Sequence, residues 1–336
     1  MKLSDLDYPF PESLVATSPC YPPRVMLVNQ GLPQEIPFQE ISSFMQPGDT
    51  LVLNDTKVLK RRVFAGEYEI LFLKQLSPFE WEVLFPARHL NLQSQIALPE
   101  GLSMTLIKKG LPQIVRLSKE ISESYFESHG DLPLPPYIQK LRDNRKNSAD
   151  DRKWYQTQWA QNPGSFAAPT ASLHFRESDI ENFQNRGVHI SKLTLHVGLG
   201  TFLPIKTEDL SCHEMHAEYV HIPNETIRNI HASKNSGRRV WAFGTTSARA
   251  IESYARGLLQ QSPEGHYNGD TELFLKPGDA FKLVDVLLTN FHQPKSTLMA
   301  LVATHSGLEN VHRSYQWAIE HKFRLFSYGD LSIWMN

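Results

Sequence analysis

Short apolar runs separated by turn residues fill the first part of the chain. Residues 50–53 form such a run directly after a Pro-Gly-Asp turn, which predicts a buried strand. Further strand-like runs follow at close spacing, which is typical of a small β-barrel or sandwich. These runs cover residues 69–73, 81–85, 103–107 and 113–117. The proline-rich residues 132–136 end this unit because proline lacks a backbone donor, and residues 142–148 then predict a polar, mobile linker.

Helical and strand patterns alternate from residue 150 onward. Helices are predicted at 177–186, 225–235, 248–259 and 307–321, and strands at 188–197, 238–243 and 283–288. Gly187 stands where a glycine ends a helix. We therefore predict an α/β fold whose main domain is discontinuous, with residues 1–61 and 150–336. An inserted small β-barrel domain, residues 62–149, interrupts it.

Polar residues follow several predicted strands. Asp55 and its neighbours come directly after the strand at 50–53, and in open sheets this edge is a common ligand site. The strand at 238–243 leads into a Gly-Thr-Thr-Ser turn at 244–247 and then a helix. Backbone N–H groups at a helix start favour a carboxylate or phosphate. Alternatively, Ser247 only caps the helix.

A histidine lies near the end of the strand at 188–197. Leu193 and Leu195 alternate with Thr194 and His196, so the histidine lies on the face opposite the leucines. A histidine there can exchange protons near neutral pH, and a structural, hydrogen-bonded histidine is the alternative.

Two further loops carry candidate chemistry. Residues 167–175 are small, bent by proline and include His174; they form either a tight packing loop or part of a site. Residues 289–297 follow a predicted strand and include Asn290 and His292. Convergence of two such loops would form a site.

Composition and local motifs limit the kinds of partner, cellular location and metal site that the chain can have. The 336 residues carry a net charge of −2, so a nucleic-acid partner would have to be held by local basic clusters. The two cysteines predict no disulfide framework and fit a reducing cytoplasm. The start of the chain lacks the apolar run of a signal peptide, and no apolar stretch is long enough to span a membrane. The Cys-His-Glu-Met-His segment at 212–216 lacks zinc-site spacing.

Basic clusters occur at 57–62, 142–153 and 238–239. Each is either a phosphate-binding patch or a solvated face. Three aromatic residues near the second cluster either stack on unpaired bases or belong to the core. They are Trp154, Tyr155 and Trp159.

Many segments, in order and over nearly the whole length, resemble the S-adenosylmethionine:tRNA ribosyltransferase-isomerase family of queuosine biosynthesis. They include Asn-Asp-Thr-Lys at 54–57, Leu-Pro-Pro-Tyr-Ile at 134–138, Pro-Gly-Ser-Phe-Ala-Ala-Pro-Thr at 163–170, Leu-His-Phe at 173–175, Thr-Leu-His-Val-Gly-Leu-Gly-Thr-Phe at 194–202, Met-His-Ala-Glu-Tyr at 215–219, residues 240–253 and 284–298, and Phe-Arg-Leu-Phe-Ser-Tyr-Gly-Asp at 323–330. The resemblance implies the same discontinuous α/β domain with an inserted β-barrel.

The resemblance also implies a reaction. The ribosyl moiety of S-adenosylmethionine is transferred to 7-aminomethyl-7-deazaguanine at the wobble position of a tRNA and isomerised, giving epoxyqueuosine, and adenine and methionine leave. A base removes the acidic proton beside the sulfonium to start the reaction. We expect no metal or redox cofactor, because S-adenosylmethionine is itself the ribosyl-donor substrate. A cytoplasmic monomer without a membrane partner is expected.

Roles follow for the matching residues. The candidates for proton transfer are His174, His196 and His292, with Asp55 behind them. The candidates for substrate binding are Gly244, Thr245, Thr246, Ser247, Arg249, Asn290, Lys295 and Ser296, of which the 244–247 turn and Arg249 are assigned to a substrate anion. The candidates for tRNA binding are Lys57, Arg61, Arg62 and Arg152.

The chain departs from the family pattern around Arg24, at Leu59 and Lys60, and at Ser172 and Gln293. These departures motivate an alternative, a catalytically silent tRNA-binding paralogue. An S-adenosylmethionine methyltransferase is disfavoured because the glycine-rich first turn of that fold is missing.

Overall fold

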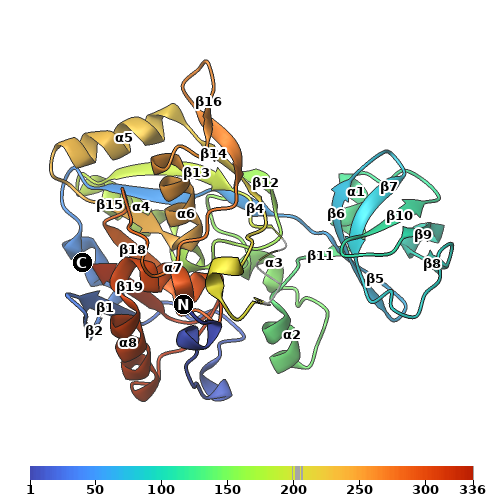
Figure 1. The fold of residues 1–336 in the computed structure, drawn as a ribbon, viewed down its shortest axis with the longest axis horizontal. Helices are drawn as coiled ribbons and strands as arrows, with labels where there is room; N and C mark the ends of the chain where they lie inside the picture. Colours follow the sequence, from blue (N-terminus) through green and yellow to red (C-terminus); the bar gives the residue numbers. More distant parts are fainter. Residues whose placement is uncertain (199, 201–204, 206, 336) are drawn as a thin grey trace.

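The fold is described from a computed structural model of all residues except 199, 201–204, 206 and 336. Its main body contains a mixed sheet with the strand order β16-β17-β14-β13-β3-β15-β18-β19-β1-β2 (Figure 1). The strands are β1 (Val25–Asn29), β2 (Leu32–Ile36), β3 (Thr50–Asn54), β13 (His189–Leu195), β14 (Glu218–Ile222), β15 (Val240–Phe243), β16 (Gln260–Gln261), β17 (Tyr267–Thr271), β18 (Val286–Asn290) and β19 (Leu331–Met335).

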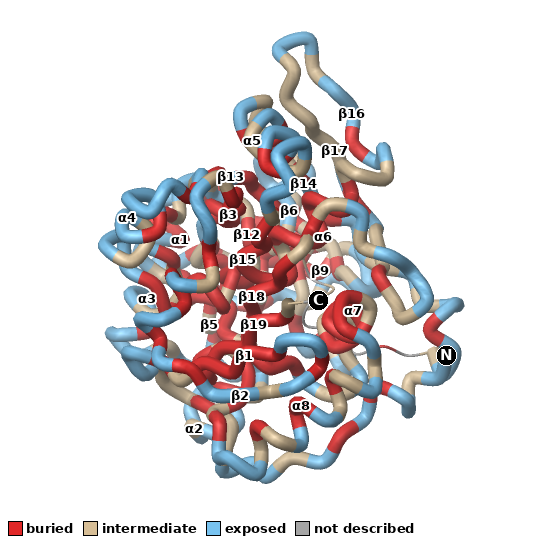
Figure 2. The backbone as a smooth tube through the Cα atoms, turned by 90° about the vertical axis from the view of Figure 1, so that its left-hand side faces the viewer, coloured by how far each residue is buried: buried red, intermediate tan, exposed pale blue. Residues whose placement is uncertain are grey.

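The four central strands β13, β3, β15 and β18 run parallel, so their carboxyl ends meet at one edge of the sheet. Both faces of these strands are covered, and they appear as a buried layer in Figure 2. In β3, Val52 packs into one hydrophobic cluster, and Leu51 and Leu53 pack into the other. This two-sided burial explains the continuous apolar run in the sequence.

Helices cover the two faces. Among them, α5 and α6 pack on the central strands, and α7 packs against α8. The main-body helices are α4 (Glu177–Asn185), α5 (Asn224–Asn235), α6 (Gly244–Ala255), α7 (Thr297–Ser306) and α8 (Leu308–Glu320). Short 3-10 turns lie at Leu3–Leu6, Glu12–Leu14, Phe38–Phe44, Pro99–Gly101, Thr170–His174 and Leu210–Cys212.

A second sheet, with the strand order β11-β5-β6-β7-β10-β9-β8, lies beside the main body (Figure 1). Its elements are β5 (Arg62–Ala65), β6 (Tyr68–Gln75), β7 (Glu80–Leu84), β8 (Gln95–Ala97), β9 (Ser103–Lys108), β10 (Gln113–Leu117), β11 (Gly130–Asp131) and α1 (Glu123–His129). The strands alternate between buried and partly exposed residues, as a sheet with one covered face does. Residues 63–126 supply their own hydrophobic cluster.

The remaining elements lie between the two sheets in Figure 1: β4 (Thr56–Val58), which pairs in parallel with β12 (Asn162–Ser165), α2 (Pro136–Arg142) and α3 (Asp151–Trp154). Arg142 was predicted to begin a mobile linker. Instead it ends α2, and its guanidinium donates to both carboxylate oxygens of the buried Asp151, at 2.9 and 2.7 Å.

The predicted mixed α/β architecture is confirmed, and the predicted strands and helices are present with shifted ends. Helix α6 begins at Gly244, four residues before its predicted start at 248. Helix α7 and strand β19 were not predicted, because both are mostly apolar and almost entirely buried, and lack the alternation that marks a half-exposed element.

Candidate active site

Asn54 forms hydrogen bonds to three segments at the carboxyl edge of the central sheet. It is the last residue of β3 and is completely buried. Its Oδ1 accepts from the backbone N–H of Thr56 and Leu195, at 3.1 and 3.0 Å. Its Nδ2 donates to the Leu195 carbonyl and to Oγ1 of Thr246, at 3.0 and 3.1 Å. One amide therefore holds the ends of β3 and β13 and the start of α6 in a fixed arrangement.

Asp55 is held next to this junction. Thr194 Oγ1 donates to its Oδ1 at 2.6 Å, and Asn162 Nδ2 donates to the same oxygen at 3.0 Å. The carboxylate is buried, so these donors replace part of its hydration. Asp55 is thus oriented by strands β13 and β12.

His196 directly follows β13 and is partly buried. Its Nδ1 is hydrogen-bonded to Thr56 Oγ1 at 2.8 Å, and its ring stacks on Tyr219 at a centroid distance of 5.9 Å. Burial lowers the pKa of the imidazole, and the charge of Asp55 partly opposes this. His196 is therefore neutral near pH 7 and able to accept a proton.

Gly164 of β12 lies against the His196 ring. A Cβ at this glycine would be 2.6 Å from Nε2 and 2.7 Å from both Cδ2 and Cε1, which is well inside van der Waals contact. Only a residue without a side chain fits there while the ring keeps its place.

His174 and Asn290 meet at the end of β18. Asn290 Oδ1 accepts from Thr170 Oγ1 at 2.8 Å, and its Nδ2 lies 3.3 Å from Nε2 of His174. His174 is buried, and burial followed by the nearby charge of Arg324 lowers its pKa to about 4. The predicted convergence of the loops at 167–175 and 289–297 is therefore present.

His292 has the surroundings of a packed core histidine. Its Nε2 is 3.0 Å from Thr289 Oγ1, its backbone N–H donates to the Tyr315 hydroxyl at 3.0 Å, and its carbonyl accepts from Tyr8. Burial lowers its pKa to about 3. These contacts favour a structural role over proton transfer.

The start of α6 combines backbone and hydroxyl groups. Gly244 has φ +86°, which glycine adopts easily, and Thr245 is buried beside it. Ser247 does not cap the helix, because its Oγ donates to the Phe243 carbonyl at 2.9 Å from inside the first turn. The capping alternative is therefore wrong.

Arg249 is not an open anion site. It is buried, its Nη1 pairs with Glu218, and its Nη2 donates to the Thr271 carbonyl at 3.2 Å. Glu218 also accepts from the Gly198 N–H, at 2.8 Å. A substrate anion at Arg249 would have to compete with Glu218, so its assigned role stays a prediction.

Lys295 and Ser296 both have structural partners. Lys295 Nζ pairs with Asp7 at 2.6 Å, and both side chains are about half exposed. Ser296 is the N-cap of α7 and accepts from the Met299 N–H at 3.1 Å. Substrate binding by these two residues likewise stays a prediction.

The basic cluster at 57–62 contains both exposed and buried side chains. Arg61 is buried over the Phe126 ring and pairs with Glu123, and Arg62 is 2% exposed and 3.3 Å from Glu69. Neither arginine is therefore part of an exposed patch, because both side chains pack into the second sheet, and tRNA binding by these two residues stays a prediction. Lys57 and Arg152 are exposed.

The aromatic residues near the second basic cluster belong mainly to the core. Tyr155 is completely buried. Trp159 is buried and donates from its indole N–H to the Asn54 carbonyl at 3.2 Å, and Trp154 is partly buried. Tyr155 and Trp159 are therefore not available to stack on unpaired bases.

Several site residues had no predicted role, and Asn162 and Gly164 are two of them. Asn162 orients Asp55 and Thr194, and Gly164 packs on His196. Both lie within or beside the family-like segment at 163–170, but neither carries a charge or a periodic pattern that would reveal a partner across the fold. Their only sequence signal is proximity to that segment.

Among the described residues, no group of three or more His, Cys, Asp and Glu side chains is arranged to hold a metal ion. None of the helices in the described part of the chain is long and apolar enough to cross a membrane.

Comparison with known proteins identifies the family. The profile described as "Queuosine biosynthesis protein" matches residues 3–333. A protein of Sulfurihydrogenibium named S-adenosylmethionine:tRNA ribosyltransferase-isomerase is 38% identical over 98% of both chains. One of the same name from Polynucleobacter necessarius is 41% identical, covering 98% of this chain and 97% of its own.

A solved structure agrees with the sequence relatives. The S-adenosylmethionine tRNA ribosyltransferase of Thermotoga maritima has a TM-score of 0.56 and 29% identity, over 99% of this chain and 100% of that chain. The chain therefore belongs to the queuosine biosynthesis protein family.

Proposed function

We propose that the protein is an S-adenosylmethionine:tRNA ribosyltransferase-isomerase. It transfers the ribosyl moiety of S-adenosylmethionine to 7-aminomethyl-7-deazaguanine at the tRNA wobble position and isomerises it, giving epoxyqueuosine and releasing adenine and methionine. The observation that carries this proposal is the match over nearly the whole chain to relatives of that name. The grouping of Asp55, His196 and Asn290 at one sheet edge supports it.

Of the three candidate histidines, His196 is best suited to be the base. It is partly buried with a lowered pKa, so its neutral form is present at pH 7, and one ring nitrogen is fixed by Thr56. The base takes the proton from the carbon beside the sulfonium, and the electron pair left there forms a C=C bond as the ring C–O bond breaks. The freed ring oxygen then forms a C=O bond at the anomeric carbon as the bond to adenine breaks, and adenine leaves with that electron pair. Asp55 stabilises the imidazolium that forms, because its negative charge favours the protonated ring.

His174 and Asn290 suit substrate orientation better than proton storage. Their hydrogen-bonded pair is buried, and His174 stays neutral well below pH 7. Neutral imidazole and amide groups fix a bound substrate without adding charge.

The next proposals concern domain organisation, oligomeric state and cofactor. We propose that residues 62–149 form the inserted barrel domain, since they have a sheet and core of their own, and that the chain acts as a monomer. S-adenosylmethionine is the ribosyl donor, and no other cofactor is required. Adenine release that persists after treatment with a chelator would support this last point.

The departure around Arg24 does not favour the catalytically silent alternative. Its guanidinium pairs with Glu35 at 2.6 Å, donates to the carbonyls of His321 and Lys322, and lies over the Phe323 ring. The residue thus stabilises packing between β1 and the segment after α8, so its sequence context reflects packing.

One assay separates the candidate functions. Purified protein is incubated with S-adenosylmethionine and tRNA that carries 7-aminomethyl-7-deazaguanine, and the small products are separated by chromatography. Release of adenine and methionine is expected. S-adenosylhomocysteine would instead indicate a methyltransferase, and tRNA binding without any product would indicate a silent binder.

A further inference from the structure

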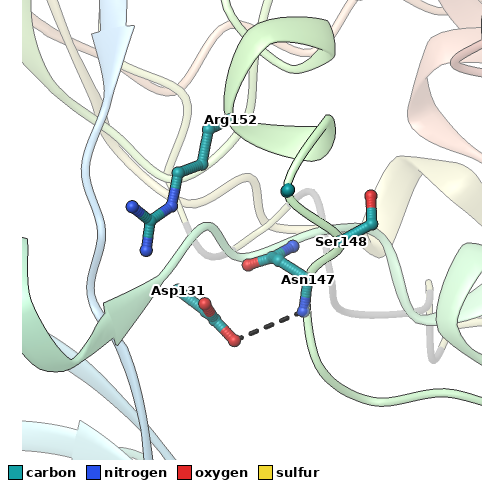
Figure 3. A pocket seen from close by; sticks show the side chains of 5 residues that line it. Asp131, Asn147, Ser148 and Arg152 are labelled. Carbon is teal, nitrogen blue, oxygen red and sulfur yellow. Dashed lines mark hydrogen bonds between the residues drawn. The ribbon is translucent and has the colours of Figure 1, made fainter.

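A pocket of about 260 Å³ lies where the second sheet meets the segment that leads into α3 (Figure 3). We call it the junction pocket. Its lining residues are Asp131, Asn147, Ser148, Ala149 and Arg152. Asp131 comes from β11 of the second sheet, and the others come from the loop before α3 and from α3 itself. The pocket therefore joins the two parts of the fold, outside the candidate active site.

The junction pocket contains polar groups without protein partners. Both side-chain amide atoms of Asn147 are buried, and neither has a hydrogen-bond partner among the described residues. Only the Asn147 backbone N–H is bonded, to Asp131 at 3.3 Å. Figure 3 shows the Asn147 amide beside the Arg152 guanidinium and the Asp131 carboxylate. Buried amides are normally paired, so this one is available to a ligand that offers both a donor and an acceptor.

The pocket lies in a cationic neighbourhood. Arg152 and Lys57 are exposed, and neither makes an ion pair with any described residue. Glu127 shows that these cations lie close together: its pKa is lowered first by the hydrogen bond from Lys60 and further by the charges of Lys57 and Arg152. Together with Asp131, which lines the pocket itself, two carboxylates therefore face three cations, and the remaining positive charge favours an anion.

The lining also restricts the kind of ligand. No aromatic ring lines the pocket, so an unpaired base would have nothing to stack on. A guanidinium matches a phosphate, and an amide next to a carboxylate matches a hydroxyl that both donates and accepts. A ribose-phosphate unit offers these groups together.

We propose that the junction pocket binds one ribose-phosphate unit of the substrate RNA, with the phosphate at Arg152 and the 2′-hydroxyl at Asn147 and Asp131. This inference rests on the proposed function for the identity of the RNA. It assigns to the region between the two sheets a role in holding tRNA while the wobble base is at the active site. Because the 2′-hydroxyl is part of the contact, the pocket distinguishes RNA from DNA.

The test measures binding of a fluorescein-labelled anticodon stem–loop, as RNA and as its all-deoxy counterpart, to the full-length protein by anisotropy over a range of salt concentrations. The variants are Arg152→Ala and Asn147→Ala. Arg186→Ala is the matched control, because Arg186 is exposed and follows α4 at the opposite, amino-terminal edge of the central strands.

The two variants should differ in their salt response. Arg152→Ala removes one phosphate contact, so binding weakens and the slope of log affinity against log salt falls by about 0.7–0.9. Asn147→Ala should weaken RNA binding about 2- to 10-fold with an unchanged slope, and should leave DNA binding unaltered. Arg186→Ala should bind as the unsubstituted protein does.

Two results would overturn the proposal. The first is RNA binding by both variants that equals that of Arg186→Ala. The second is an Asn147→Ala effect of equal size on RNA and DNA. Melting temperatures of the variants show whether each is folded. The adenine-release assay is read separately: its failure with unsubstituted protein would reject the proposed activity, whereas the binding differences would still test the pocket.

Discussion

The packing of Gly164 on His196 leads to a quantitative prediction for Gly164→Ala. The added methyl would lie 2.6–2.7 Å from three ring atoms, whereas unstrained contacts between such atoms are about 3.5 Å or more. The ring therefore has to move by about 1 Å. Such a shift lengthens the 2.8 Å bond from Nδ1 to Thr56 and turns Nε2 away from its present direction. A displacement of this size in a reacting group costs about 10²-fold in rate.

The loss of stability should be small enough to leave the protein folded. Overpacking by one methyl typically costs about 1–3 kcal/mol, so the variant should still fold. Gly269→Ala is the matched control, because Gly269 has a similar φ of +148° but its Cβ would meet ordinary contacts at 3.7 Å or more. Single-turnover adenine release should fall by about 10²-fold in Gly164→Ala and stay near normal in the control.

A double substitution tests whether the loss acts through the histidine. If Gly164 only positions His196, the Gly164→Ala/His196→Ala protein should be no slower than His196→Ala alone, since coupled residues are not additive. Thr56→Ser should retain activity and Thr56→Val should lose it, because only the hydroxyl bonds Nδ1. Unchanged adenine release in folded Gly164→Ala would refute the positioning argument.

Further predictions concern the base, the buried arginines and acid stability. His196→Ala should slow single-turnover adenine release by at least about 10²-fold; lost stability with near-normal turnover would instead mark a structural histidine. Glutamate at both Arg61 and Arg62 should lower the melting temperature, rather than weaken tRNA binding alone, because both guanidiniums are buried; a selective loss of tRNA affinity in fully stable protein would contradict this. His174 and His292, with pKa values lowered to about 4 and 3, bind protons more weakly folded than unfolded. Below pH 6.5 the unfolded chain therefore gains protons first, and each histidine should cost up to about 1.4 kcal/mol of stability per pH unit down to its folded pKa. Denaturant midpoints between pH 7 and 4 measure this, and a flat profile would count against it.

The sequence predicted those parts of the fold that have a local cause. Strand β3 is continuously apolar because both of its faces are covered, and α4 ends at a glycine with φ +82°. Helix α6 was placed too late because its first turn is made of glycine and hydroxyl residues, which usually precede a helix. In this case Ser247 bonds back to Phe243 within the helix.

The candidate site was predicted only in part, for a related reason. Residues at strand ends, such as Asp55 and His196, follow from sheet topology, because parallel strands bring their carboxyl ends together. What surrounds them does not follow, since Asn162 and Gly164 reach the site through the short β4–β12 pairing, which has no hydrophobic period. Burial depth was equally invisible: His196 and His292 are similar in sequence context, but only His292 is packed among Tyr8 and Tyr315.

Charge shows most clearly what a linear pattern omits. Lys57 and Arg62 belong to one basic run, but Lys57 is the exposed residue of the otherwise buried β4, whereas Arg62 starts β5 with its guanidinium inside the second sheet. The chain therefore passes from β4 to the second sheet within this run. The positive charge of Lys57 is exposed to solvent, whereas the charges of Arg61 and Arg62 are buried. Arg152, which follows Lys57 by 95 positions, lies near that exposed part, since the charges of both residues lower the pKa of Glu127. The proposed RNA surface at this junction therefore depends on chain topology, because the chain leaves the main sheet after β3, forms β4 before the second sheet, and returns from the second sheet to pair with β4 at β12.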